Sequence, residues 1–324
     1  MHSESSDKPV QIAVVIPCYR VIAHIEAVVG AIGPEVGKIY CVDDCCPDHS
    51  GEHIRRTVSD PRVTVLQNET NLGVGGATMA GYVQAVQDGA DIIVKIDGDG
   101  QMDPRLIMRF VRPIMEGRAD YTKGNRYFYI ESLKKMPMVR LLGNTILSFV
   151  SKVSTGYWDI FDPVNGYTAI HRKVIEVLPL DKISQRYFFE SDILFRLNTH
   201  DAVVEEIPMD AVYGDEVSQL KLGKVIPEFI AKHTVNIFKR IGYQYFLRDF
   251  NIASIELLVG FSLLVFGLVF GTTHWLESNR TGIPVSAGTV MLAALPVLMG
   301  MQLLLSFLSY DTRRVPRAPL HKRR

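Results

Sequence analysis

Residues 92–101 read IIVKIDGDGQ, and this stretch decides the fold that we expect. It begins as a short, mainly apolar run, which is typical of a buried strand, and the strand ends on Asp97 and Asp99. Two carboxylates two residues apart at a strand end can jointly hold a hard divalent ion. Mg²⁺ usually takes one or two carboxylates and fills its shell with waters and phosphate oxygens. The stretch therefore predicts an ion site for a phosphate-bearing ligand.

The preceding sequence repeats the strand pattern. Apolar runs predict strands at 12–17, 39–42, 63–66 and 92–96, with helical stretches between them. Strands and helices that alternate over short links favour an α/β fold, with a mixed, mostly parallel sheet covered on both faces. The strand at 39–42 also ends on an acidic pair, Asp43 and Asp44. Since ligands of such sheets bind outside the carboxyl ends of the strands, both acidic pairs are candidates for one site.

A glycine-rich run, NLGVGGA, occupies residues 71–77. It is not the dinucleotide-binding fingerprint, because it follows the third predicted strand and Thr78 stands at the last glycine position. We expect a turn that caps a helix beginning at Ala77, with backbone N–H groups free to meet a phosphate or ribose.

Composition limits the classes of partner. Lys plus Arg and Asp plus Glu are equal at 35 each, so no nucleic-acid partner is expected. The four cysteines, Cys18, Cys41, Cys45 and Cys46, lack zinc-site spacing and fit buried residues of a reducing compartment. The polar segment 1–9 does not resemble a signal peptide.

The 47% hydrophobic content gathers after residue 250. Two apolar runs, 252–271 and 286–308, are long enough to cross a bilayer, although a buried helical hairpin is the alternative. A basic tail follows at 310–324, and the positive-inside rule places both this tail and the N-terminal portion in the cytoplasm. The tail is also expected to bind anionic lipid.

The segment at 226–250 has apolar residues at helical spacing with basic residues between them. This pattern predicts an amphipathic helix in the membrane interface, and packing on the soluble domain is the alternative.

Six motifs together resemble the family 2 glycosyltransferases of the GT-A fold: VVIPCYR, VDDCCPDHSG, NLGVGGA, VKIDGDGQMDP, KGNRY and DPVNGYTAIHR. Within that family the likeness is to the polyprenyl-phosphate group, typified by dolichol-phosphate mannose synthase and bacterial undecaprenyl-phosphate glucosyltransferases. It implies a catalytic domain at 10–225 and a multi-pass protein of the bacterial inner membrane. It also implies inverting transfer of a sugar from a nucleotide diphosphate to a polyprenyl phosphate, with Mg²⁺ or Mn²⁺.

The resemblance also implies roles for individual residues. The nucleoside pocket would be lined by Pro17, Tyr19, Asp43 and Asp44, with Asp97 beside it. The metal ligands would be Asp97, Asp99 and Gln101. The remaining residues would serve the acceptor phosphate (Arg126 and Arg140) and the sugar pocket (Asp162, Glu190 and Asp192). Asp97, Asp99, Asp162 and Arg126 would form the catalytic set.

Four of these residues have a structural alternative. Arg126 and Arg140 are alternatively surface cations, Asp162 a turn cap and Asp192 a solvated residue. Relatives carry an Arg that meets the donor diphosphate just before the membrane helices. Here that segment reads VYGDEVSQLKLGK, with Glu216 near the place, and Lys221 or Lys224 would have to supply the charge.

Two other functions stay open. A glycolipid or glycan hydroxyl is the alternative acceptor, although no QxxRW motif of processive synthases is present. A non-catalytic scaffold that binds sugar nucleotides is the second alternative. The sequence does not identify the sugar, and a UDP-sugar is favoured over GDP-mannose.

Overall fold

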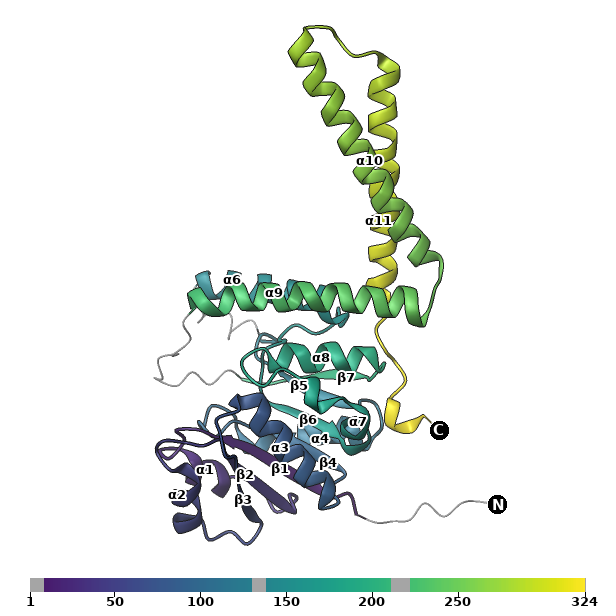
Figure 1. Cartoon of the computed structure of the whole chain (residues 1–324). Coiled ribbons are helices and arrows are strands. Elements are labelled where there is room, and N and C mark those ends of the chain that lie inside the picture. Colours follow the sequence, from purple (N-terminus) through teal and green to yellow (C-terminus); the bar gives the residue numbers. More distant parts are fainter. Residues whose placement is uncertain (1–8, 130–137, 211–221, 324) are drawn as a thin grey trace, which may run out of the picture. The chain divides into compact units, whose positions relative to one another are not determined.

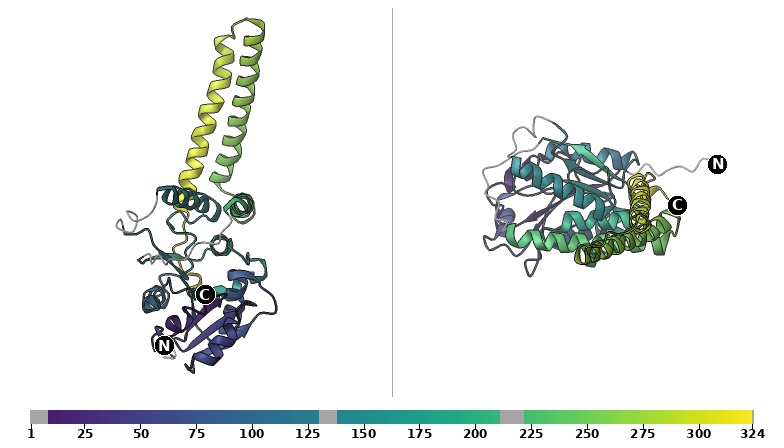
Figure 2. Two further views of the ribbon diagram at one scale, coloured as in Figure 1. Left: turned by 90° about the vertical axis from the view of Figure 1, so that its left-hand side faces the viewer. Right: turned by 90° about the horizontal axis from the view of Figure 1, so that it is seen from above.

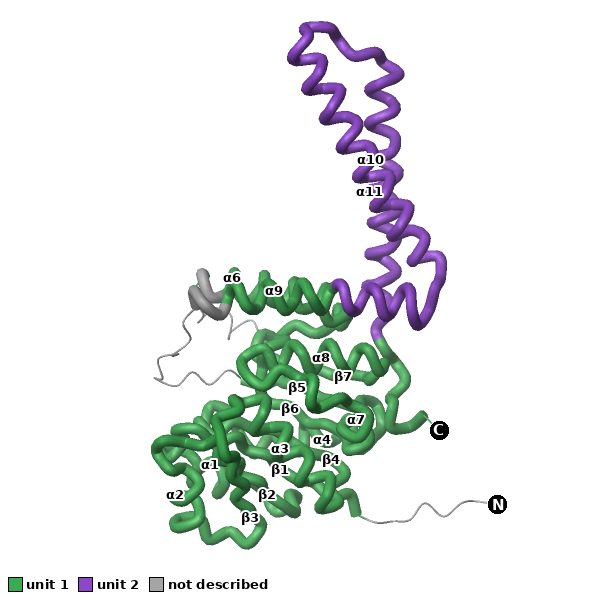
Figure 3. The backbone as a smooth tube through the Cα atoms, in the orientation of Figure 1, with its two compact units in different colours: residues 1–237, 316–324 green, residues 238–315 purple. Residues whose placement is uncertain are grey.

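The structure, a computed structural model, describes residues 9–129, 138–210 and 222–323, with the backbone alone at 139–140 and 222–225. The chain divides into two compact units (Figure 3). The first comprises Met1–Ile237 and Pro316–Arg324, and the second comprises Phe238–Val315.

The first unit is built on one sheet (Figure 1). Within the described residues the sheet has seven strands in the order β3-β2-β1-β4-β6-β5-β7. Their bounds are β1 Ile12–Cys18, β2 Lys38–Asp43, β3 Val63–Gln67, β4 Ile92–Lys95, β5 Tyr121–Asn125, β6 Thr168–His171 and β7 Val204–Pro208. All neighbours pair in parallel except β6, which is antiparallel to β4 and β5. The predicted α/β fold with a mixed, mostly parallel sheet is confirmed.

Helices cover both faces of this sheet, and β1 shows why. Val14 and Ile16 belong to the core that contains α1 (Ile25–Gly30) and α4 (Ile107–Met115). Val15 points to the other face, where a Cβ at Gly81 of α3 (Gly73–Gln87) would collide with it. A strand buried on both faces reads as a continuous apolar run, which is why the sequence predicted it well. Three further helices belong to the first unit: α2 Ser50–Thr57, α7 Arg172–Val177 and α8 Phe189–Thr199.

Two longer helices, α6 (Met138–Thr155) and α9 (Leu222–Ile241), run roughly parallel to each other (Figures 1 and 2). Within the first unit they meet where Ser154 Oγ lies 2.7 Å from His233 Nδ1. His233 is buried against Phe188 and Phe229. Burial disfavours the charged imidazolium and lowers the pKa of His233 to about 4.

Acid is therefore expected to loosen this contact. Because the pKa of His233 is lower in the folded than in the unfolded protein, its contribution to stability is complete above about pH 6.5 and is lost as the pH falls toward 4. The loss reaches about 3 kcal/mol at most. Thermal unfolding of the purified protein between pH 7.5 and 4 measures it, and His233→Gln should flatten the curve. An equal slope in the variant would contradict this assignment.

The C-terminal segment belongs to the first unit and packs on it around Asp120. The Asp120 carboxylate, which is fully buried, accepts hydrogen bonds from the backbone N–H of Leu320 (2.7 Å) and of His321 (3.0 Å), and lies 2.6 Å from His321 Nδ1. The His321 ring stacks on that of His171 with centroids 4.4 Å apart, and Lys322 Nζ donates to the Glu116 carbonyl. Part of the basic tail thus contacts protein, and lipid binding by the tail stays a prediction.

The second unit contains two long apolar helices, α10 (Ile252–Thr281) and α11 (Ala287–Arg313), which include the predicted spans. Each is long enough to cross a membrane. They approach closely at glycines: a Cβ on Gly300 would lie 2.7 Å from the Gly260 carbonyl, and a Cβ on Gly267 would lie 2.7 Å from the Ala293 carbonyl. Small residues of this kind let the backbones of apolar helices approach closely, so that van der Waals packing holds the helices together.

A buried ion pair lies at the end of this helical pair. Arg240 donates two hydrogen bonds to the Asp311 carboxylate, at 2.7 and 2.9 Å, and Tyr245 Oη donates a third at 2.6 Å. All three side chains are buried. The π-helix Gly242–Arg248, which carries Tyr245, is thereby tied to the end of α11.

Candidate active site

The acidic pair that follows β2 shapes the loops around it. Asp43, which is buried, accepts hydrogen bonds from the backbone N–H of Cys46 (2.8 Å) and of Gly51 (2.7 Å). Asp44 accepts from Leu72 N at 2.9 Å and from Gly73 N at 2.7 Å. These carboxylates therefore fix the wall of the predicted nucleoside pocket.

Two residues at the end of β1 complete this wall. Pro17 is half-buried, and Tyr19 is exposed just beyond the strand. Because β1 and β2 are parallel neighbours, these residues share one sheet edge with the Asp43 and Asp44 pair.

The glycine-rich run corrects one expectation. Helix α3 begins at Gly73 rather than at Ala77, and Gly73 has a φ of 85°. The backbone N–H groups of Gly75 and Gly76 both donate to the Gln185 carbonyl, and those of Leu72 and Gly73 donate to Asp44. A Cβ at Gly75 would collide with the backbone at Ser184. The glycines thus permit close packing on 184–185, and these N–H groups are not free for a phosphate.

The segment after β4 presents the predicted metal ligands. Asp97, Asp99 and Gln101 are half-buried, and Gln101 N donates to Asp99 Oδ1 at 2.9 Å, which closes the turn. Across the described residues, no group of three His, Cys, Asp or Glu side chains could hold a metal by itself. Two carboxylates and an amide oxygen nevertheless suit an ion that completes its shell with water and phosphate oxygens.

A cluster of charged side chains lies beneath this turn, and its lysines were not predicted from the sequence. Lys95 Nζ is 2.7 Å from Asp97 Oδ1 and 3.8 Å from Glu190 Oε1, and Lys95 is only 1% exposed. Burial disfavours the charged ammonium of Lys95. The attraction of the Asp97 and Glu190 carboxylates outweighs this effect of burial and raises the pKa of Lys95. Lys123 Nζ donates to the Asn165 carbonyl. Burial lowers the pKa of Lys123 to about 8.

Two of the predicted catalytic residues meet directly. Arg126 donates from Nε to Asp162 Oδ2 at 2.8 Å and from Nη2 to Oδ1 at 3.0 Å. Asp162 is fully buried, whereas the Arg126 side chain is 28% exposed. The pair therefore fixes the plane of a guanidinium group that reaches the surface, and a bidentate contact of this type is strong and directional.

The half-buried Glu206 side chain, which the sequence pattern did not point to, holds the other side of this turn. Its Oε1 accepts from the backbone N–H of Phe161 (2.6 Å) and of Asp162 (2.8 Å), and its Oε2 accepts from Asn125. Burial raises the pKa of Glu206.

Two of the three residues predicted for the sugar pocket, Glu190 and Asp192, face different ways. Glu190 lies beside Lys95, under the acidic turn. Asp192 accepts hydrogen bonds from Ser184 N at 2.8 Å and from Asn236 at 3.3 Å, and it pairs with Arg196. The solvated alternative for Asp192 is wrong, since its side chain is buried between α8, α9 and the loop before α8.

With this geometry established, the sequence profile of the family described as Glycosyl transferase family 2 matches residues 13–178. The chain belongs to this family. The match includes β1 to β6, both acidic pairs and the Arg126–Asp162 pair.

Named relatives of this family 2 glycosyltransferase act on polyprenyl phosphates. It is 30% identical over 202 residues to the polyprenol monophosphomannose synthase of Mycolicibacterium smegmatis, covering 60% of this chain and 75% of that one. It is 26% identical over 228 residues to the undecaprenyl-phosphate mannosyltransferase of Micrococcus luteus, covering 69% and 93%. It is 32% identical over 154 residues to the UDP-N-acetylglucosamine–dolichyl-phosphate N-acetylglucosaminyltransferase of Methanococcus voltae, covering 48% of this chain and 61% of that protein.

Solved structures support the fold of this glycosyltransferase. The glucosyl-3-phosphoglycerate synthase of Mycobacterium tuberculosis, solved with Mn²⁺ and UDP, matches with a TM-score of 0.54 and 19% identity. The match covers 70% of this chain and 80% of that one. At this identity the likeness concerns the GT-A fold alone.

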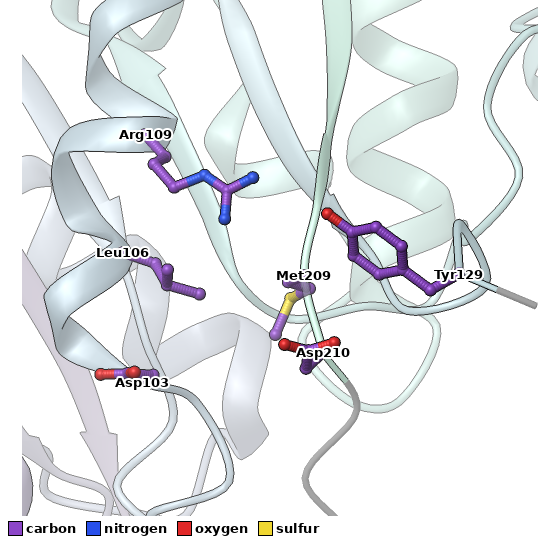
Figure 4. Close-up of a pocket in the computed structure, with 6 residues that line it drawn as sticks. All are labelled: Asp103, Leu106, Arg109, Tyr129, Met209 and Asp210. Atoms are coloured by element: carbon purple, nitrogen blue, oxygen red, sulfur yellow. The ribbon is translucent and has the colours of Figure 1, made fainter. Parts of the chain in front are cut away.

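A cavity of about 210 Å³ lies beside the candidate site of the glycosyltransferase (Figure 4). It is lined by Asp103, Leu106, Arg109, Tyr129, Met209 and Asp210. Met209 joins it to the site, because its sulfur contacts Asn165, which also donates to Asp162. The cavity does not include Asp97 or Asp99, so the acidic turn and not the cavity is the candidate reaction centre.

Several predicted residues lie outside this description. Glu216 and Lys221 fall in a segment that the structure does not describe, and the side chains of Arg140 and Lys224 are not described either. Their assignment to acceptor or donor phosphates stays a prediction.

Proposed function

We propose that this glycosyltransferase transfers a sugar from a nucleotide diphosphate to a polyprenyl phosphate at the cytoplasmic face of the membrane, with inversion at the anomeric carbon. The observation that carries the proposal is an acidic turn together with an arginine fixed by a buried carboxylate, in a chain that also has two helices long enough to span a bilayer. The relatives named above support the acceptor class, and a UDP-sugar remains the favoured donor.

Asp97, Asp99 and Gln101 would hold the Mg²⁺ or Mn²⁺ that this fold implies. When bound, the ion would neutralise charge on the diphosphate leaving group. The Mn²⁺ in the structure of the glucosyl-3-phosphoglycerate synthase supports this choice of ion for a protein of this fold.

Arg126 would bind the acceptor phosphate. A phosphate is already anionic at neutral pH and needs little help from a general base, but it must be held close to an anionic donor. The Arg126 guanidinium suits this task because Asp162 fixes its plane and phosphate accepts its donors in a fork. Asp162 would then act by positioning Arg126 and by adding negative charge near the sugar, not as an obligatory base.

The surfaces of α6 and α9 support placement at a lipid interface. Met138, Leu142, Ile146 and Phe149 are exposed at spacings of three and four residues, so they form one apolar face of α6. Ile226 and Ile230 are exposed one turn apart on α9. Apolar helix faces of this kind favour the membrane interface, where the head group of a polyprenyl phosphate must lie.

Purified protein with Mn²⁺, a short-chain polyprenyl phosphate and a panel of UDP- and GDP-sugars tests the proposal. We expect a polyprenyl-phosphate sugar, identified by mass, that disappears with EDTA. Donor consumption without this product would move the acceptor to a glycolipid or glycan. No consumption of any donor would favour the scaffold alternative.

A further inference from the structure

Lys95 is a buried cation in contact with the first acid of the metal-binding turn. It ends β4, and its ammonium lies 2.7 Å from Asp97 Oδ1. Gly166 leaves the space that the ammonium occupies, because a Cβ there would collide with Lys95 Nζ and lie 2.8 Å from Asp97 Oδ2. Glu190 approaches from α8 at 3.8 Å. Packing and two carboxylates therefore hold this cation in place.

The contact changes the charge that the turn offers to an ion. Asp97, Asp99 and Glu190 carry −3 and Lys95 carries +1, so these four groups sum to −2, and Lys95 cancels one of the three negative charges. A divalent ion bound at Asp97 would lie close to the ammonium. Like charges at such distances repel each other strongly where water is excluded. Glu190 lies 3.8 Å from the same ammonium, farther than Asp97, and so offsets this repulsion only in part. A donor diphosphate would offset it, because its own negative charge faces both cations.

We propose that Lys95 is a positioning residue that holds Asp97 and weakens the turn for a bare divalent ion, so that the ion binds together with the donor diphosphate. The proposal rests on the proposed function in taking a nucleotide diphosphate as donor. Its consequence is coupled binding: the nucleotide tightens the ion and, by linkage, the ion tightens the nucleotide by the same factor.

Electron paramagnetic resonance of free Mn²⁺ measures this coupling on the full-length protein, with UDP or GDP as the probe and no lipid acceptor present. For the wild type we expect Mn²⁺ to bind at least about tenfold more tightly with nucleotide than without it. In Lys95→Met, a variant of similar volume, nucleotide-free Mn²⁺ should bind about tenfold more tightly, and the coupling should shrink by a similar factor. A purely structural lysine would not raise the affinity for the bare ion.

Two further variants keep the test decisive. Lys95→Met leaves Glu190 buried without its nearest cation, so the double variant K95M/E190Q, which removes one charge of each sign, is measured beside it. Lys123→Met removes a neighbouring buried ammonium that donates to the Asn165 carbonyl, and nucleotide-free Mn²⁺ affinity should change by less than about threefold. Thermal unfolding checks that each variant is folded.

Unchanged or weaker binding of bare Mn²⁺ in both Lys95 variants would overturn the role of Lys95. A wild type that binds neither UDP nor GDP would instead count against the proposed function. The effect of Lys95→Met on bare Mn²⁺ is read without nucleotide, so the two failures are distinguishable.

Discussion

Replacing Asp99 by asparagine is expected to lower kcat by about a thousandfold, because loss of an ion worth several kcal/mol of charge stabilisation costs tenfold per 1.4 kcal/mol. The substitution keeps the volume of the side chain, and the asparagine Oδ1 can still accept from Gln101 N, which closes the turn. The fold should therefore survive while the ion is lost. Turnover by the variant, read as polyprenyl-phosphate sugar at saturating donor and Mn²⁺, measures the effect.

Asp91→Asn is the matched control, since Asp91 immediately precedes β4 and Asp97 and Asp99 follow it. The Asp91 carboxylate accepts from Gln11 N and lies 3.8 Å from Arg172, at the opposite end of the strand. Its loss should change kcat by no more than about twofold. Asp99→Asn activity that stays within about tenfold of the wild type and remains sensitive to EDTA would place the ion elsewhere.

Asp311→Asn is expected to destabilise the second unit by about 3–5 kcal/mol, because it leaves the buried Arg240 guanidinium without its anionic partner. The Tyr245 hydroxyl loses a charged acceptor in the same substitution. A fall in the midpoint of thermal unfolding in detergent, followed by helical circular dichroism, measures the loss.

Two variants separate the buried pair from a general effect of charge. Asp249→Asn removes a carboxylate that lies 3.7 Å from Arg314 with a 48% exposed side chain, and an exposed pair is worth less than about 1 kcal/mol. R240M/D311L removes both buried charges and should recover most of the stability. If Asp311→Asn melts at the same temperature as Asp249→Asn, the buried pair is not a stabilising contact.

The sequence predicted those parts of the fold and site that depend on local pattern. β1 and β4 are apolar runs buried on both faces, and their bounds differ from the predicted ones by one residue. Asp97 and Asp99 follow β4 directly, so the carboxyl edge of the sheet brings them to the site without information from distant residues.

The contacts that were missed depend on residues far apart in the chain. Lys95 looks like a polar interruption of a strand, and its burial makes sense only with Glu190 and Gly166 beside it. The glycine run was misinterpreted for the same reason, because the acceptor of its N–H groups is the distant Gln185 carbonyl. The available signal in the sequence was a single lysine in an otherwise apolar strand, just before an acidic pair.

The hydrogen bonds from Leu320 and His321 to Asp120 affect the order in which the protein folds during synthesis. These residues follow both apolar helices in the chain and are therefore synthesised after them. The buried Asp120 carboxylate therefore lacks the N–H donors of Leu320 and His321 until both helices have been synthesised, and the first unit is completed only then. Because Pro316–Arg324 belong to the first unit, the chain returns to that unit after the two helices. Synthesis of the two helices thus precedes the last folding step of the first unit.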